Sequence, residues 1–107
     1  MINRSIENTI AIQSATLSHL SKLRVLWLAR FSRLGYGVED LESLFFNLNT
    51  ECLVATSLGE LCGFLMFERS GQAIQLLGLA VSEGYGRQGV GYALVERCMQ
   101  VAATAAV

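Results

Sequence analysis

Residues 82–94 read SEGYGRQGVGYAL, and this stretch constrains the fold more than any other part of the chain. Its four glycines are Gly84, Gly86, Gly89 and Gly91. The stretch follows the apolar run Ala73–Val81, which is typical of a strand covered on both faces, and leads into a helical pattern. Such a loop can bind phosphate, because the first N–H groups of a helix lack internal partners and its dipole attracts negative charge. The alternative is a loop that only makes a tight strand-to-helix turn.

Two well-known phosphate loops do not fit this stretch. Gly84, Gly86 and Gly89 have the G-x-G-x-x-G spacing of a dinucleotide fingerprint. That fingerprint requires a parallel βαβ unit and an acidic residue about 20 positions further on. Here the count reaches the tail TAAV, which holds no acid. A P-loop requires Lys followed by Ser or Thr after its second glycine, whereas Val90 and Gly91 follow Gly89.

The N-terminal half predicts a strand and two helices. Ile10 and Ile12 alternate with polar neighbours, which indicates a short half-buried strand. Apolar residues then recur at steps of three and four, as on one face of a helix that Gly35 can end. These residues are Leu20, Leu23, Trp27, Phe31 and Leu34. A shorter helix follows, with one apolar face made of Val38, Leu41, Phe45 and Leu48.

The C-terminal half predicts three strands and a helix. The β-type runs ECLVATS and LCGFLMFER are separated by LGE, a hairpin signal, and SGQ turns the chain into Ala73–Val81. After the glycine loop, one face of a last helix is apolar: Leu94, Cys98, Val101, Ala102 and Ala105. The pattern predicts a single α+β domain over residues 1–107, in the order strand, helix, helix, three antiparallel strands, helix.

Composition excludes several kinds of partner. Eight Lys and Arg against nine Asp and Glu give a formal net charge of −1. This balance lacks the excess of basic residues that is typical of proteins that bind nucleic acid or an anionic membrane. The start MINRSIENTI has no secretory pattern, so a cytoplasmic location is expected. The three cysteines show no metal-ligand spacing, so no metal site is expected. Hydrophobic residues make up 52% of the chain, which suggests a partner or a missing piece.

The segment LAVSEGYGRQGVGYALVERC resembles the acetyl-CoA-binding motif of the GNAT N-acetyltransferase superfamily, in which an L-A-V type strand leads into [RQ]-x-x-G-x-[GA] and a helix. Gly89 and Gly91 match the two small positions, and Arg87 and Gln88 match the polar lead-in. The opening [RQ] falls on Gly86, a departure that should weaken binding rather than abolish it. The order of elements upstream also matches that family.

The resemblance implies acetyl-CoA as co-substrate and a primary amine as acceptor. The pantetheine arm would pair with the main chain of Leu79, Ala80 and Val81, and the pyrophosphate would lie on N–H groups of the loop and first helical turn. The implied cofactor-binding residues are Leu79, Ala80, Val81, Gly86, Arg87, Gln88, Gly89, Val90, Gly91 and Tyr92. Tyr85 and Tyr92 flank the loop and would face phosphate.

No catalytic residue is identified. The glutamate that acts as base in lysine-modifying members of the family falls on Gln75, which cannot accept a proton at neutral pH. Glu68 and Glu83 are the nearest carboxylates in sequence, and a water chain is the other candidate. On the acceptor side, the helix–helix loop GYGVED offers Tyr36 to an acceptor and Glu39 or Asp40 to its cationic amine, or else serves only as a helix break.

In the family, the fold continues after this helix with a further strand, a tyrosine-bearing helix and a hairpin. The resemblance therefore implies that the C-terminal half of the fold is absent and that Ala73–Val81 is an exposed apolar edge. Three explanations stay open. The chain is a part of a longer enzyme, or it is completed by a second copy as a homodimer, or it is a non-catalytic acyl-CoA-binding or partner-binding module.

Overall fold

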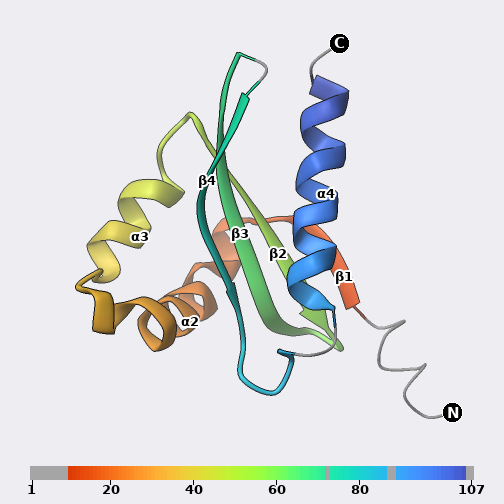
Figure 1. Cartoon of the computed structure of the whole chain (residues 1–107). Coiled ribbons are helices and arrows are strands. Elements are labelled where there is room, and N and C mark those ends of the chain that lie inside the picture. Colours follow the sequence, from red (N-terminus) through yellow and green to blue (C-terminus); the bar gives the residue numbers. More distant parts are fainter. Residues whose placement is uncertain (1–9, 72, 87–88, 106–107) are drawn as a thin grey trace, which may run out of the picture.

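The computed structural model describes residues 10–71, 73–86 and 89–105 (Figure 1). The elements, in chain order, are β1 (Ile10–Ser14), η1 (Leu17–His19), α2 (Leu20–Phe31), η2 (Ser32–Leu34), α3 (Val38–Phe45), β2 (Thr50–Ser57), β3 (Glu60–Ser70), β4 (Ala73–Val81) and α4 (Val90–Ala105). This order confirms the α+β arrangement predicted from the sequence. Among the described residues, no helix is both long enough and apolar enough to span a bilayer.

The four strands form one sheet in the order β1-β2-β3-β4, and each neighbouring pair is antiparallel. The hairpin between β2 and β3 turns at Leu58 and Gly59, which both have positive φ angles. β4 pairs with β3 alone, so its other side is an edge of the described sheet. The predicted strand Ala73–Val81 is confirmed with these bounds and at the edge. The expectation that it is covered on both faces is wrong for its first half, where Gln75 is exposed and Leu76 is 52% exposed, because α4 and α2 cover mainly the end of the strand.

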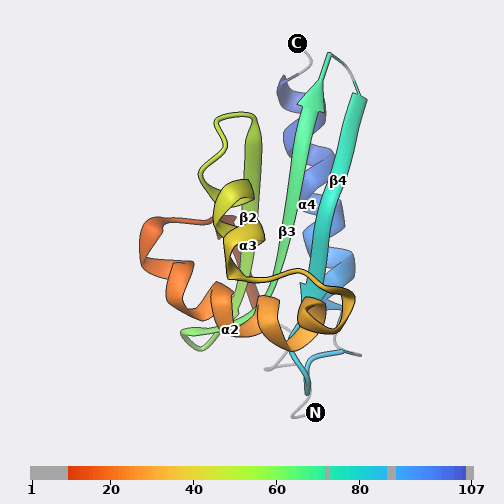
Figure 2. The ribbon, with the colours of Figure 1, turned by 90° about the vertical axis from the view of Figure 1, so that its left-hand side faces the viewer.

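Helices cover both faces of the sheet, α2 and α3 on one and α4 on the other (Figures 1 and 2). The period-two alternation of β3 divides its side chains between two cores. Phe64 and Met66 pack with Trp27 and Leu41 on the α2–α3 side, and Leu65 and Phe67 pack with the α4 side. The α4-side core also holds Val90, Leu94 and Cys98, which are one helical turn apart.

Gly63 on β3 allows α4 to approach the sheet closely. A Cβ built at this position would lie 2.9 Å from Cγ1 of Val90, 3.1 Å from the carbonyl oxygen of Ala80 and 3.2 Å from Cδ1 of Leu94. These separations are shorter than van der Waals contact, so a side chain would push the helix start away from the strand. Gly63 therefore sets the depth at which the N-terminal turn of α4 sits beside β4.

Two sequence expectations about apolar helix faces are wrong. Leu34, assigned to the buried face of the first helix, is 68% exposed, because the α-helix ends at Phe31 and residues 32–34 form a tighter 3-10 turn. Leu48, assigned to the second helix face, is fully exposed, because α3 ends at Phe45 and a turn follows. The predicted left-handed Gly35 is confirmed, with φ of 90°.

Candidate functional site

The strand that leads into the glycine loop carries a β-bulge. Met66 pairs with Gly78 and Phe67 pairs with Leu76, so Leu77 has no partner residue on β3. The bulge places Leu77 and Gly78 on the same side of the sheet, against the α2–α3 core. Bulges bend an edge strand and redirect its side chains, and they recur beside active sites.

The exit of β4 into the loop is fixed by main-chain hydrogen bonds. The N–H of Ser82 donates to the carbonyl of Cys62 at 2.8 Å, and the N–H of Tyr85 donates to the carbonyl of Ser82 at 3.0 Å. Gly84 and Gly89 have φ angles of 95° and 78°, a region that side chains other than glycine rarely adopt. The loop thus has a defined turn at its start and a glycine-dependent turn at its end.

The N-terminus of α4 follows directly. Its first intrahelical hydrogen bond runs from the N–H of Ala93 to the carbonyl of Gly89 at 2.9 Å. The N–H groups of Val90, Gly91 and Tyr92 therefore precede any helical acceptor and point toward the loop. A Cβ at Gly91 would lie 3.6 Å from Cγ2 of Val81, so the first turn of α4 packs beside the last residue of β4.

The structure brings most of the predicted cofactor-binding residues to this junction. Leu79 and Val81 pack toward α4, while Ala80 is buried toward α2. Val90 is 1% exposed and packs in the α4-side core, whereas Tyr92 is 74% exposed. Gly86 lies in an exposed turn. The predicted residues Arg87 and Gln88 lie outside the described residues.

Tyr85 departs from the expectation that it faces the phosphate site. It is half-buried and packs against the α4-side core, where it contributes apolar surface under the loop. Tyr92, on the exposed side of the first turn of α4, remains available to a ligand.

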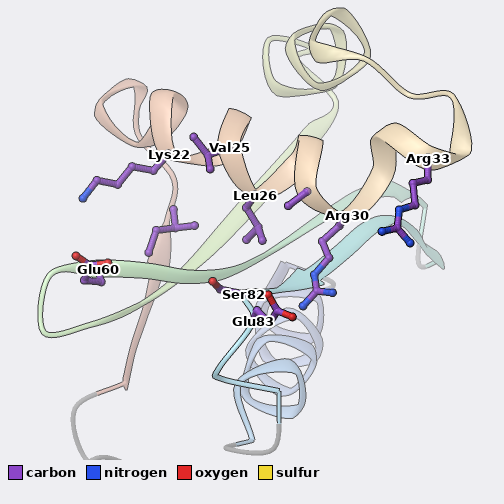
Figure 3. Close-up of a pocket in the computed structure, with 10 residues that line it drawn as sticks. Lys22, Val25, Leu26, Arg30, Arg33, Glu60, Ser82 and Glu83 are labelled. Atoms are coloured by element: carbon purple, nitrogen blue, oxygen red, sulfur yellow. The ribbon is translucent and has the colours of Figure 1, made fainter.

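A contact that the sequence did not reveal links α2 to the end of β4. The guanidinium of Arg30 donates from Nε (3.0 Å) and Nη2 (2.7 Å) to the main-chain carbonyl of Val81. Figure 3 shows Arg30 directed toward Ser82 and Glu83, across a groove of about 850 Å³ between α2 and the strand ends. Lys22 and Arg33 line the same groove. No local spacing signals a contact between residues 51 positions apart.

Glu68, one of the two carboxylates nearest to Gln75 in the sequence, lies directly opposite Gln75 in the sheet. Glu68 on β3 and Gln75 on β4 are register partners, so their side chains share one face of the sheet. This is the face that carries Met66 and Leu77, on the α2–α3 side. Glu68 is half-buried and has no hydrogen bond or ion pair within the described part of the chain. Glu83, the other carboxylate considered, is exposed at the loop.

The helix–helix loop forms a second, smaller cavity of about 380 Å³ beside Leu77. Tyr36 and Asp40 line this cavity, whereas Glu39 does not. One carboxylate oxygen of Asp40 accepts a hydrogen bond from the N–H of Gly37 at 2.8 Å, which caps the start of α3.

The cysteines are poor candidates for catalysis. Burial raises the pKa of the Cys52 thiol from 9.0 to about 12. Burial also raises the pKa of Cys62 and of Cys98, so thiolate is scarce at neutral pH. Within residues 10–71, 73–86 and 89–105, no group of three or more His, Cys, Asp or Glu side chains could hold a metal ion.

Comparison with known proteins identifies the class. The model of the acetyltransferase (GNAT) family matches residues 20–107, and the chain belongs to this family. No curated protein matches the sequence.

Solved structures share the fold. A ribosomal-protein-alanine N-acetyltransferase from Brucella melitensis superposes with a TM-score of 0.77 at 21% identity, over 89% of this chain and 72% of that one. An aminoglycoside acetyltransferase from an uncultured soil metagenomic sample, in complex with sisomicin, gives 0.75 at 23% identity, over 94% and 74%. An aminoglycoside 6'-N-acetyltransferase complexed with coenzyme A gives 0.77 at 20% identity, over 88% and 56%.

Proposed function

We propose that this chain binds acetyl-CoA, or another short acyl-CoA, and takes part in acyl transfer to a primary amine. The observation that carries the proposal is that three features lie together at one end of the sheet. They are the open edge of β4, the glycine turn at Gly84 and the first turn of α4, where Gly91 lies beside Val81. Together they offer main-chain groups to a ligand that has both amide and diphosphate parts.

The two ends of such a ligand need different chemistry. The pantetheine amides can pair with the outward main-chain groups of β4 at Leu79 and with the N–H of Val81, as an added strand would, while the carbonyl of Val81 is already bonded to Arg30. The pyrophosphate can accept hydrogen bonds from the N–H groups of Val90, Gly91 and Tyr92, where the helix dipole favours negative charge. Glycine at 89 leaves this approach free of side-chain atoms, since a Cβ there would contact nothing within 4 Å.

In the transfer step, the amine nitrogen forms a bond to the thioester carbonyl carbon and the carbon–sulfur bond breaks. The amine loses a proton and the leaving thiolate gains one. Glu68 is the carboxylate closest in register to the position of Gln75, and we propose it, directly or through water, as the proton acceptor. The buried thiols argue against an acyl-cysteine intermediate and favour direct transfer.

A second candidate is an acyl-CoA-binding module without catalysis. Gln75 favours this alternative, because its amide cannot serve as a base where the resemblance places a glutamate. The two candidates share the binding site and differ only in turnover.

The proposal is tested by incubating the chain with acetyl-CoA and a panel of primary amines, and by measuring released thiol together with the mass of the amine product. We expect acetylated amine in an amount that matches the released thiol. Acetyl-CoA binding without any product would favour the non-catalytic module, and absence of both would reject the proposal. A Glu68→Gln variant, in which the carboxylate is neutralised at nearly constant volume, should lower the rate without lowering acetyl-CoA affinity.

A further inference from the structure

The cavity at the helix–helix loop indicates what kind of amine the site takes. We propose that it binds a primary monoamine that carries an aromatic or apolar group, with the group in the cavity and the ammonium against Asp40. This inference rests on the proposed acyl transfer, for which it names the class of acceptor. It separates this chain from structural neighbours whose names specify aminoglycosides or ribosomal-protein alanine.

The walls of the cavity are mainly apolar. Five of the side chains that line it are Trp27, Phe31, Leu34, Tyr36 and Leu77. Leu34 and Tyr36 are 68% and 50% exposed, so they form an accessible rim, whereas Trp27 is 3% exposed and forms part of the floor. A cavity of about 380 Å³ is large enough for one aromatic ring with a short side chain.

The floor has a fixed orientation. The indole N–H of Trp27 donates to the carbonyl of Gly37 at 2.9 Å, which satisfies the polar atom of the ring. The ring centroids of Trp27 and Phe31 are 4.7 Å apart with an interplanar angle of 51°, a tilted packing. Aromatic edges and faces arranged in this way favour a further ring over a polyhydroxylated sugar, which would leave hydroxyl groups unsatisfied.

The described residues that line the cavity carry one negative charge. Asp40 is the only charged residue among the described residues that line it. Its Oδ2 accepts the capping hydrogen bond of Gly37, which leaves Oδ1 for a ligand. One carboxylate matches one ammonium, whereas a polycationic aminoglycoside would bring several charges to a site that can pair with one.

The cavity is also in the right place for acyl transfer. Leu77, one of its walls, is the bulge residue of β4 and lies two positions before Leu79, where we propose the pantetheine arm pairs. Gln75 and Glu68 occupy the same face of the sheet one step further along the strand. An amine held in the cavity therefore lies on the side of β4 that offers both an acyl group and a carboxylate.

The test uses Trp27, the only tryptophan of the chain, as a reporter. The full chain is titrated with 2-phenylethylamine, with the neutral 2-phenylethanol and with sisomicin, while tryptophan fluorescence is recorded. Acetyl-CoA affinity is measured separately by calorimetry. We expect a saturable change with 2-phenylethylamine, at least about fivefold tighter binding than for the alcohol, and weaker binding of sisomicin.

Two variants test whether the carboxylate of Asp40 causes the preference for the amine. Asp40→Asn removes the carboxylate but keeps an oxygen that can cap Gly37, so the fold should be retained. It should abolish the preference for the amine over the alcohol. Glu39→Gln removes a carboxylate from the adjacent position, which does not line the cavity, and should leave the preference unchanged.

The outcomes are distinct. The inference is overturned by an unsaturable response to 2-phenylethylamine, by equal affinities of amine and alcohol in the unmodified chain, by tighter binding of sisomicin, or by an unchanged preference in Asp40→Asn. Saturable amine binding without acetyl-CoA binding would overturn the acyl transfer itself while supporting the amine cavity. Acetyl-CoA binding without amine binding would reject only the acceptor class.

Discussion

Arg30 and Val81, which are 51 positions apart, are joined by two hydrogen bonds from one guanidinium to one main-chain oxygen. The contact connects the last turn of α2 to the final residue of β4, just before the glycine loop begins. It holds the proposed acyl-CoA site from the α2 side of the sheet, while the packing of α4 on Gly63 holds it from the other side.

Replacing Arg30 should loosen the start of the loop. In Arg30→Met, loss of a charge-assisted contact at an exposed position should lower the free energy of unfolding by about 1 kcal/mol. Hydrogen exchange at the N–H of Ser82 and Tyr85 should accelerate more than exchange in the middle of β3. Arg33→Met is the matched control, because Arg33 lines the same groove without a hydrogen bond to described residues. Equal acceleration in both variants would show that the Arg30–Val81 contact does not hold the loop.

Two substitutions at Gly89 distinguish the effect of charge on acetyl-CoA binding from the effect of loop conformation. Gly89→Asp should abolish acetyl-CoA binding, because its carboxylate would lie against the diphosphate at the start of α4. Gly89→Asn is the matched control, since Asn and Asp tolerate a positive φ to a similar degree and only Asp adds charge. Calorimetric titration should show a much larger loss for Asp than for Asn. Equal affinities of the two variants would mean that the loop is only a turn.

Gly63 should be intolerant of any side chain. Gly63→Ala should destabilise the fold by about 1–3 kcal/mol, because its Cβ would clash with Val90, Leu94 and the main chain of Ala80. Gly86→Ala is the comparison, because a Cβ there meets nothing within 4 Å. Urea unfolding monitored by circular dichroism measures both. A Gly63→Ala variant as stable as Gly86→Ala would contradict the close packing of α4.

The free energy of unfolding should fall with rising pH in the alkaline range, because the thiol of Cys52 is buried. Its thiol has a pKa of 9.0 when exposed and about 12 in the fold, so between these values the unfolded chain ionises and the native chain does not. The unfolded state then binds fewer protons, and stability falls as pH rises from about 9 to about 12. Urea midpoints at pH 8 and pH 10 measure the fall, and Cys52→Ala should show a smaller one. An identical fall in Cys52→Ala would show that other groups cause it.

The sequence predicted the order of elements well, because apolar periodicity and glycine turns are local signals. The turn at Gly71 that precedes Ala73–Val81 and the left-handed Gly35 both depend on glycines that can be read directly from the sequence. Leu34 and Leu48 were misplaced because a periodic pattern does not show where a helix tightens or ends.

The site was less predictable, because its parts come from distant elements. The glycine loop and the first turn of α4 are contiguous in sequence and could be recognised there. The Arg30–Val81 contact and the Glu68–Gln75 pair depend on helix docking and strand register, which no local pattern specifies. Gly63 carried a weak signal, since a glycine inside an apolar strand often marks a close approach of another backbone.

Calorimetric titration of acetyl-CoA into the unmodified chain tests the central claim most directly, with the mass in solution determined on the same sample by light scattering. We predict saturable binding with micromolar affinity, by the monomer or by a dimer, that is retained with desulfo-CoA, because the proposed contacts are made by the main chain and not by the thiol. No heat of binding from a folded sample would contradict the account and leave the glycine loop as a strand-to-helix turn.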